Sequence, residues 1–199
     1  MQSGSGATGG QSGSNAEAGA SGVCAAHVGG AVSRIQKKAG GEEAAETAYF
    51  PMFFDMTGQK IVIAGAGVIA TRRAETLAGF DADLVVVAPD GTETMEQLER
   101  DGAVCWERRA FEESDLDGAY MVLAATSDRE LNDTIVEMCR SRKILVNHAG
   151  DKNQCDFYFP GIARDGRIVI GATTSGKNHR LARQLTEGLR IWLEQLEGK

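Results

Sequence analysis

Two glycines and an alanine follow a short apolar run at a fixed spacing. Residues 60–64 (KIVIA) have the β-branched, apolar character of a buried strand, and the hexapeptide 65–70 (GAGVIA) comes directly after them. Gly65 permits a tight turn, Gly67 lets a bound group approach the backbone, and Ala70 lets helix and strand pack closely. The N-terminus of the following helix offers free N–H groups to an anion. The spacing is that of the dinucleotide-binding fingerprint; the alternative is a tight strand–helix turn that binds nothing.

Two other loops are predicted to reach the same ligand. Pro89 and Asp90 follow a second predicted strand, residues 83–88, where an acid commonly binds the ribose hydroxyls of a dinucleotide. Asp90 suits equally well the cap of a helix that begins near Thr92. Because no Arg stands at this position, NAD is favoured over NADP. Thr126 follows a strand predicted beside the first one, at the switch point where ligands bind in open α/β sheets.

These loops require strands and helices that alternate along the chain. The predicted strands are residues 60–64, 83–88, 103–107, 119–125 and 144–146. The predicted helices run from the hexapeptide to about residue 77 and over residues 92–100 and 129–141, the last capped by Ser127 or Asp128. This order predicts an α/β fold, a Rossmann-like, doubly wound parallel sheet with right-handed crossovers.

A different pattern follows the parallel sheet. Residues 157–164 and 167–173 predict two strands joined by Asp165-Gly166, which is a β-hairpin signal. An amphipathic helix is predicted over residues 179–196. The hairpin and helix hold too little core to stand alone, so we expect this dimerisation segment to pack against a second copy in a homodimer.

The chain is therefore predicted to have three segments. Residues 1–48 are rich in Gly, Ser and Ala without periodic apolar spacing, which predicts a disordered tail. Residues 49–155 form the dinucleotide-binding domain and residues 156–199 the dimerisation and substrate segment. The aromatic run at residues 49–54 is expected to pack beneath the first strand as part of the core.

Composition excludes several classes of function. The net charge of −7 and pI of about 5.1 argue against nucleic acid and anionic membranes as partners. Neither a secretory leader nor an apolar run of membrane-spanning length is present, so a cytoplasmic protein is expected. The four cysteines include no C-x-x-C pair, which favours incidental thiols over disulfides or a zinc site, and no metal site is expected.

Several ordered blocks carry a resemblance to one family. They are residues 49–53, 65–73, 86–90, 124–132, 155–160 and 174–177 with 181–183. Over about residues 49–189 the chain resembles the precorrin-2 dehydrogenases of siroheme synthesis, including the amino-terminal module of siroheme synthase. The resemblance implies an oxidoreductase that uses NAD to oxidise precorrin-2 to sirohydrochlorin. Some members also insert ferrous iron, as a sirohydrochlorin ferrochelatase.

The resemblance also implies which residues bind the ligands. The implied NAD contacts are Gly65, Gly67, Val68, Ile69, Pro89, Asp90 and Thr126. The tetrapyrrole substrate carries many carboxylates, which guanidinium groups pair bidentately. The proposed substrate contacts are Arg164, Thr174, Ser175, Gly176, Lys177, His179 and Arg183, with Arg167 and Arg180 nearby. The alternative for each basic residue is a solvated face of the hairpin or helix.

Two departures from the family pattern bear on the chemistry. The family reads Asn-Val-Val-Asp-Asp after the fifth strand, with the first Asp catalytic; counting from Asn147, that position is Gly150 and the second is Asp151. We expect Asp151 to accept a proton as hydride leaves to NAD. His148 is a further candidate, and an ordinary loop histidine is its alternative. The family also continues into a small helical module, so the segment that ends at Lys199 is expected to be truncated and chelation is less expected than dehydrogenation.

Two other functions fit parts of this pattern. One is a non-catalytic NAD- or tetrapyrrole-binding module, which would bind NAD tightly without turnover. The other is a ligand-gated regulatory nucleotide-binding domain, although such domains usually carry the acid directly at the end of the second strand.

Overall fold

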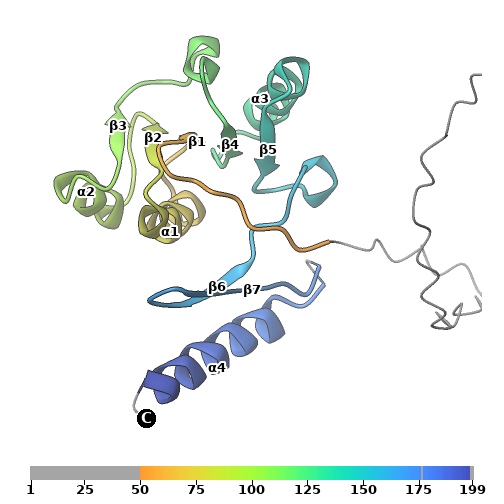
Figure 1. Ribbon diagram of the computed structural model, residues 1–199. Helices are drawn as coiled ribbons and strands as arrows, with labels where there is room; N and C mark the ends of the chain where they lie inside the picture. The colour runs from red at the N-terminus through yellow and green to blue at the C-terminus, as the bar shows by residue number, and fades with distance from the viewer. Residues whose placement is uncertain (1–49, 176, 198–199) are drawn as a thin grey trace, which may run out of the picture. The chain divides into compact units, whose positions relative to one another are not determined.

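The computed structural model describes residues 50–175 and 177–197; the predicted tail, residues 1–48, and Gly176 lie outside these ranges. A five-stranded sheet has the order β3-β2-β1-β4-β5, and all neighbouring strands in it are parallel (Figure 1). Its strands are β1 (Lys60–Ala64), β2 (Asp83–Val87), β3 (Cys105–Glu107), β4 (Met121–Ala124) and β5 (Leu145–His148). This topology confirms the predicted Rossmann-like, doubly wound sheet.

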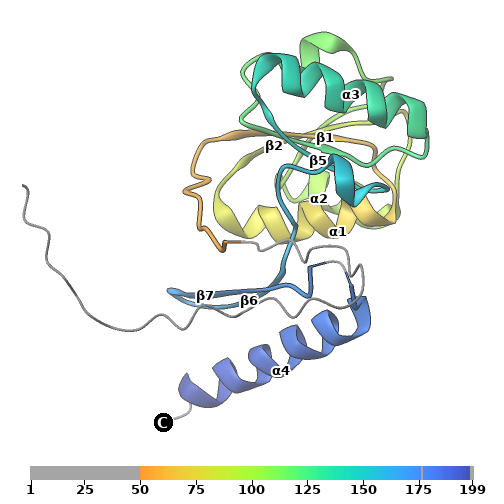
Figure 2. The ribbon, with the colours of Figure 1, turned by 90° about the vertical axis from the view of Figure 1, so that its right-hand side faces the viewer.

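Helices connect the strands and cover both faces of the sheet. They are α1 (Val68–Leu77), α2 (Glu93–Arg100) and α3 (Arg129–Arg142), with short 3₁₀ turns η1 (Ala78–Phe80), η2 (Glu113–Leu116) and η3 (Lys152–Gln154). Figure 2 shows α3 over one face of the sheet and α1 and α2 over the other. Within the described residues, no helix has both the length and the apolar character needed to cross a lipid bilayer.

The two faces of the sheet bury separate apolar layers. On one face Ala70 and Ala74 of α1 pack with strand residues that include Ile63. On the other face Ile135 of α3 packs with strand residues that include Val122. Strands covered on both faces must be apolar where they are buried, which explains why β4 and the part of β1 that follows Lys60 are continuous apolar runs.

β5 is longer than predicted, and the difference moves two polar residues into the interior. The sequence predicts a strand that ends at Val146 and a polar loop after it, whereas β5 continues through Asn147 and His148. Both side chains are buried. Asn147 is tolerated there because its Nδ2 donates to the carbonyl oxygen of Phe157 at 2.8 Å, in the chain that returns alongside β5.

The aromatic run before β1 is exposed, so the prediction that it is core is wrong for the described residues 50–54. Phe50 is 84% exposed and Phe53 is 73% exposed, and residues 50–56 form no helix or strand. Phe54 makes an edge-to-face contact with Tyr120 at 6.4 Å between ring centroids. Within the described residues, Met56 is the first buried apolar side chain. The helices already cover both faces of β1, which leaves little apolar surface there for further aromatic side chains.

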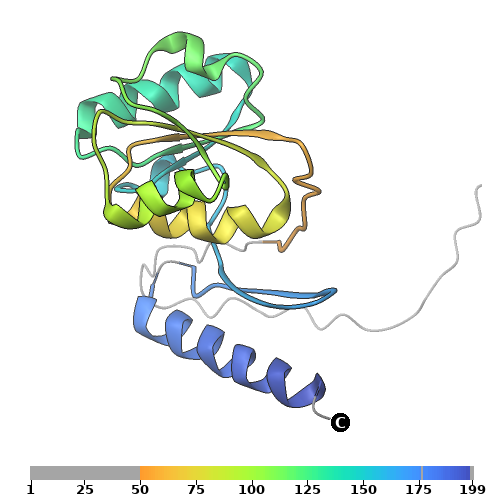
Figure 3. The same ribbon diagram turned by 90° about the vertical axis from the view of Figure 1, so that its left-hand side faces the viewer.

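The predicted hairpin and final helix are both present. β6 (Gly161–Asp165) and β7 (Ile168–Ala172) pair antiparallel, and α4 (His179–Glu197) follows them. Figure 3 shows α4 lying along this hairpin. Gly161 makes the close approach possible, because a Cβ at that position would collide with Thr186 of α4.

Candidate active site

The turn between β1 and α1 has the geometry that the hexapeptide predicts. Gly65 has φ +102°, which L side chains disfavour, and an added Cβ would lie 2.5 Å from the carbonyl oxygen of Ala125. Gly67 faces open space instead, since no described part of the chain comes within 4 Å of an added Cβ. Ala70 is fully buried. The first glycine thus closes the turn against the loop after β4, and the second leaves room for a ligand.

The N-terminus of α1 is suited to an anion. Its N-cap is Gly67, with no capping side chain, and no acidic residue lies in the first turn. The first N–H groups of a helix have no partner inside it and carry a partial positive charge. Val68 and Ile69 begin the helix with 78% and 45% exposed surface, so apolar side chains flank this terminus. The arrangement is that of a pyrophosphate site.

The loop after β2 resolves one of the two predicted roles of Asp90. The cap of α2 is Thr92, whose Oγ1 accepts a hydrogen bond from the N–H of Met95 at 3.1 Å. Asp90 therefore does not cap the helix. Thr92 Oγ1 also lies 2.8 Å from Thr71 Oγ1, which ties this loop to α1 beside the glycine turn. Pro89 and Asp90 are exposed at the same edge of the sheet, where a ribose contact stays the prediction.

Thr126 lies in the loop after β4, and Asn132 holds it in place. The buried Asn132 accepts a hydrogen bond from the Thr126 N–H at 3.1 Å and donates one to the Thr126 carbonyl at 3.0 Å. The Thr126 hydroxyl lies 2.8 Å from Asn132 Oδ1. Of the two predicted caps of α3 the structure uses Asp128, whose Oδ1 accepts from the N–H of Leu131 at 3.1 Å. The loop is thus fixed on both sides of Thr126.

A pocket of about 210 Å³ opens at this edge of the sheet, between the loops after β4 and β5 and the start of α1 and α3. Its lining residues are Ile69, Ala125, Thr126, Ser127, Arg129, Asn132, His148, Ala149 and Gly150. Of the predicted cofactor residues, Ile69 and Thr126 are in its wall. The others lie on loops after the neighbouring strands β1 and β2, so all of them share the carboxyl edge of one sheet.

His148 is a buried ionisable residue in the wall of this pocket, with a side chain that is 2% exposed. Its Nδ1 accepts hydrogen bonds from the N–H groups of Gly150 at 2.9 Å and Asp151 at 3.0 Å. Because Nδ1 is an acceptor, the proton of the neutral ring is on Nε2. Nε2 lies 3.2 Å from Asp133 Oδ1 but is not aligned for a hydrogen bond, and it has no hydrogen-bond partner among the residues that the structure describes.

The predicted base, Asp151, lies beside the pocket and is not among its lining residues. Its Oδ1 accepts from the N–H of Asn153 at 2.9 Å and caps η3. Its Oδ2 lies 3.7 Å from Arg129 Nη2, and Arg129 is in the pocket wall with a mostly exposed side chain. The Asp151 carboxylate therefore lies next to Arg129, a residue of the pocket wall, and does not line the pocket itself. Its catalytic role stays a prediction.

The predicted substrate residues lie at opposite ends of α4. Thr174 and Ser175 form the turn before the helix, where the Thr174 hydroxyl donates to the Asn178 carbonyl at 2.9 Å. Lys177, His179 and Arg183 are at the same end. Arg164 lies near Leu193, roughly 20 Å along the helix from His179 at 1.5 Å per residue. One chain therefore does not bring Arg164 together with the other predicted contacts.

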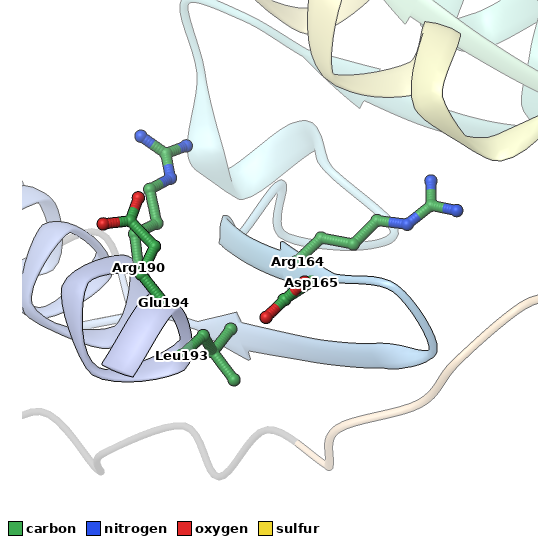
Figure 4. Close-up of a pocket in the computed structure, with 5 residues that line it drawn as sticks. All are labelled: Arg164, Asp165, Arg190, Leu193 and Glu194. Atoms are coloured by element: carbon green, nitrogen blue, oxygen red, sulfur yellow. The ribbon is translucent and has the colours of Figure 1, made fainter. Parts of the chain in front are cut away.

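Arg164 has a different set of neighbours. It lines a second pocket of about 400 Å³ with Asp165, Arg190, Leu193 and Glu194. Figure 4 shows its side chain extending away from Arg190. The Arg164 guanidinium lies 5.1 Å from the centre of the Phe80 ring, a cation–π contact between the hairpin and the region after α1.

The cysteines within the described ranges are unpaired: Cys105, Cys139 and Cys155. Burial raises the pKa of the Cys139 thiol to about 12, and burial also raises the pKa of Cys155. Protonated, partly buried thiols are poor nucleophiles. Among the residues described, no group of three or more His, Cys, Asp and Glu is placed to hold a metal ion. Cys24 lies outside the described residues.

Arg129 and Asn132 line the pocket, and the predicted site residues did not include them. Arg129 directly follows the cap Asp128, and the first turn of a helix at the carboxyl edge of a sheet faces a ligand there. Asn132 is a polar residue on the buried stripe that includes Ile135 and Cys139. That mismatch is a sequence signal, although it does not tell which loop the amide holds.

The loops after β1, β2 and β4, with the open N-terminus of α1, define a dinucleotide-binding domain of the Rossmann type. Residues 52–161, more than half of the chain, match the NAD(P)-binding family NAD_binding_7. The chain belongs to this NAD(P)-binding family.

Relatives and solved structures extend the similarity beyond that domain. The chain is 34% identical over 142 residues to the multifunctional siroheme biosynthesis protein HemA of Ruminiclostridium josui, covering 71% of this chain and 28% of that protein. It is 34% identical over 145 residues to siroheme synthase of Photorhabdus laumondii, covering 73% of this chain and 31% of that one. It thus spans less than a third of the length of either relative.

Among solved structures, "SirC, precorrin-2 dehydrogenase" is similar in fold, with a TM-score of 0.61 and 24% sequence identity. The likeness covers 75% of this chain and 76% of that one.

Proposed function

We propose that this chain catalyses the NAD-dependent oxidation of precorrin-2 to sirohydrochlorin in siroheme biosynthesis. The observation that carries the proposal is the pocket at the carboxyl edge of β4 and β5, which adjoins an uncapped helix N-terminus. Two comparisons support the proposal: the chain is similar in sequence to siroheme synthase, and its fold is similar to that of "SirC, precorrin-2 dehydrogenase". Precorrin-2 would lose two electrons and one proton as hydride to NAD, and a second proton to a base or to water.

The residues present fit a dinucleotide. The N–H groups at the start of α1 and the open space at Gly67 would receive the pyrophosphate. Asp90 would bind the adenosine ribose and Thr126 the nicotinamide end, since they lie on loops at opposite sides of β1. When bound, NAD supplies the hydride acceptor. The cytoplasm holds the NAD pool, and we expect the reaction to occur there.

We assign two tasks to the polar groups around the pocket. Arg129 is exposed and cationic at the pocket wall, so it suits a carboxylate of the substrate. Asp151 and Asp133, at 3.7 Å and 3.9 Å from the Arg129 guanidinium, orient that side chain. Asp151 is the carboxylate best placed to accept the second proton, provided that its loop brings it to the bound substrate.

We propose a homodimer built on α4. One face of the helix packs on the hairpin through Thr186 and Leu193, which are buried. The adjacent face is apolar and half-exposed; its residues are Leu181, Leu185, Trp192 and Leu196. Helical spacing aligns these four into one stripe, as a subunit interface requires. Pairing across a two-fold axis would also let the basic residues at the start of one α4 meet a site on the other subunit.

The test is NADH formation by the purified chain with NAD and freshly prepared precorrin-2, comparing wild type with Asp151→Asn. Turnover in the wild type supports the dehydrogenase, and its loss in the variant with NAD affinity intact supports Asp151 as the base. Turnover in both removes Asp151 from the chemistry. Adding ferrous iron to the same reaction and following siroheme formation tests chelation.

One observation favours a second function, a non-catalytic NAD- or tetrapyrrole-binding module. No carboxylate is among the described residues that line the pocket, and Gly150 stands where the resemblance places the catalytic acid. Tight NAD binding by a folded dimer, with no NADH formed, would establish this function.

A further inference from the structure

We propose that His148 is a positioning residue for the dehydrogenation, which holds the turn at residues 149–151 in the shape that the reaction needs. The inference rests on the proposed function for its catalytic consequence, and on geometry for the tether itself. His148 touches neither reacting group; it acts through the backbone of Gly150 and Asp151.

Two backbone N–H groups of the turn donate hydrogen bonds to the His148 ring. Nδ1 accepts them from two successive residues, Gly150 at 2.9 Å and Asp151 at 3.0 Å. A strand that ends in such a turn leaves these donors without ladder partners, and a partly buried N–H without an acceptor is costly. The imidazole therefore does for this turn what a capping side chain does for a helix.

These two hydrogen bonds, here called the tether, lie between the pocket and the predicted base. Ala149 and Gly150 form part of the pocket wall, and Asp151 directly follows them. Asp151 Oδ2 in turn lies 3.7 Å from Nη2 of Arg129, at the start of α3. Loss of the tether would thus move the wall, the carboxylate and its arginine partner together.

The His148 ring also packs closely against Gly150. A Cβ there would lie 3.3 Å from His148 Cε1, which is tighter than most side-chain contacts, and at an ordinary contact distance of 3.6 Å from Nδ1. The ring fills the space that a larger residue at this position would need. An alanine at position 150 would therefore press on the imidazole, and the ring or the turn would have to shift by a few tenths of an ångström.

Asp133 lies beside the ring without a hydrogen bond to it. Nε2 lies 3.2 Å from Asp133 Oδ1, which accepts a hydrogen bond from Gln154 Nε2 at 2.5 Å. The Cys155 thiol lies 3.3 Å from the carbonyl oxygens of His148 and Asp151, at the far end of the same loop. Contacts of the His148 ring and of the Cys155 thiol thus join the two ends of the loop at residues 148–155.

The test compares His148→Asn with His148→Leu. Asn places an acceptor oxygen near the position of Nδ1, whereas Leu keeps the bulk and removes the acceptor. We expect His148→Leu to lower kcat by about tenfold to a hundredfold, as for other misplaced groups, with NAD affinity within about twofold of wild type. We expect His148→Asn to keep kcat within about threefold of wild type.

Hydrogen exchange at the Gly150 and Asp151 amides provides a readout that does not need turnover. Both amides should be protected in the wild type and in His148→Asn, and unprotected in His148→Leu. Unchanged protection in His148→Leu, or an equal loss of kcat in both variants, would overturn the proposal. If the wild type forms no NADH, the proposed function fails, while the exchange data still decide the tether.

If His148→Leu does not fold, Gly150→Ala takes its place. Its added methyl group crowds the ring, so exchange at the two amides should rise and kcat should fall in a folded protein. Unchanged exchange and kcat in Gly150→Ala would contradict the proposal.

Discussion

Replacing Gly67 by Asp should stabilise the fold and abolish NAD binding. Gly67 is the N-cap of α1 with φ −73° and ψ −178°, a conformation that any residue adopts, and its added Cβ meets open space. Asp is among the best N-cap residues, and its charge favours a helix N-terminus. We expect a gain of about 0.5 kcal/mol in the free energy of unfolding, or roughly 1 to 2 °C in Tm.

The same carboxylate would stand where the pyrophosphate binds. Two unit charges 4 Å apart repel by about 4 kcal/mol at an effective dielectric constant of about 20. That energy corresponds to about a thousandfold rise in the Kd for NAD. Gly67→Asn is the matched control, because Asn also caps the helix but carries no charge. It should bind NAD more weakly than wild type and far more tightly than Gly67→Asp.

Isothermal titration calorimetry with NAD and thermal unfolding of the apo-protein measure the two effects. A Kd for Gly67→Asp within about threefold of wild type would show that the phosphates do not approach α1. A fall in Tm of more than about 5 °C would show that position 67 does not face open space. Either result refutes the reasoning that links this turn to the cofactor.

Three further predictions concern stability and assembly. Gly65→Ala should lower the free energy of unfolding by about 3 kcal/mol or more in urea titrations, because the methyl group would meet the Ala125 carbonyl at a positive φ; a loss under about 1 kcal/mol would contradict this. Asp115→Asn should cost about 2 kcal/mol at neutral pH, since Arg109 holds the carboxylate at 2.5 and 2.9 Å and lowers its pKa. A lowered pKa stabilises the fold above the unfolded value of about 3.9, so this difference should shrink as the pH falls below about 4; a constant difference would rule out the ion pair as its cause. Trp192→Glu should convert the proposed homodimer to a folded monomer in light scattering, because Trp192 is 51% exposed and lies off the face that packs on the hairpin; a wild-type monomer would remove the proposed interface.

The sequence determined the strands and loops that make the dinucleotide site. The β-branched run before Gly65 gives β1 at the predicted residues, and the hexapeptide gives both the tight turn and the open helix start. These features depend on neighbours in the chain: a glycine that closes a turn and an apolar run that must be buried are local facts. The hairpin at Asp165-Gly166 and the helix after it were predictable for the same reason.

The sequence could not decide which polar residues lie inside the protein. Asn147 and His148 follow an apolar run like loop residues, yet both are buried, and later parts of the chain form a hydrogen bond with one side-chain nitrogen of each. Nor could it reveal that Asn132 holds Thr126, or that Arg164 packs on Phe80, at the opposite end of α4 from Lys177, His179 and Arg183.

At residues 50–54 the error is the reverse, because apolar residues that were predicted to be buried are exposed. Helices already cover both faces of β1, so the aromatic side chains find no free surface there. The local sequence pattern determines which residues form turns, strands or helices. Whether a side chain is buried, and which groups it bonds to, depends on the surfaces that distant segments already cover. Only the packed sheet, helices and returning loop of the tertiary structure decide this.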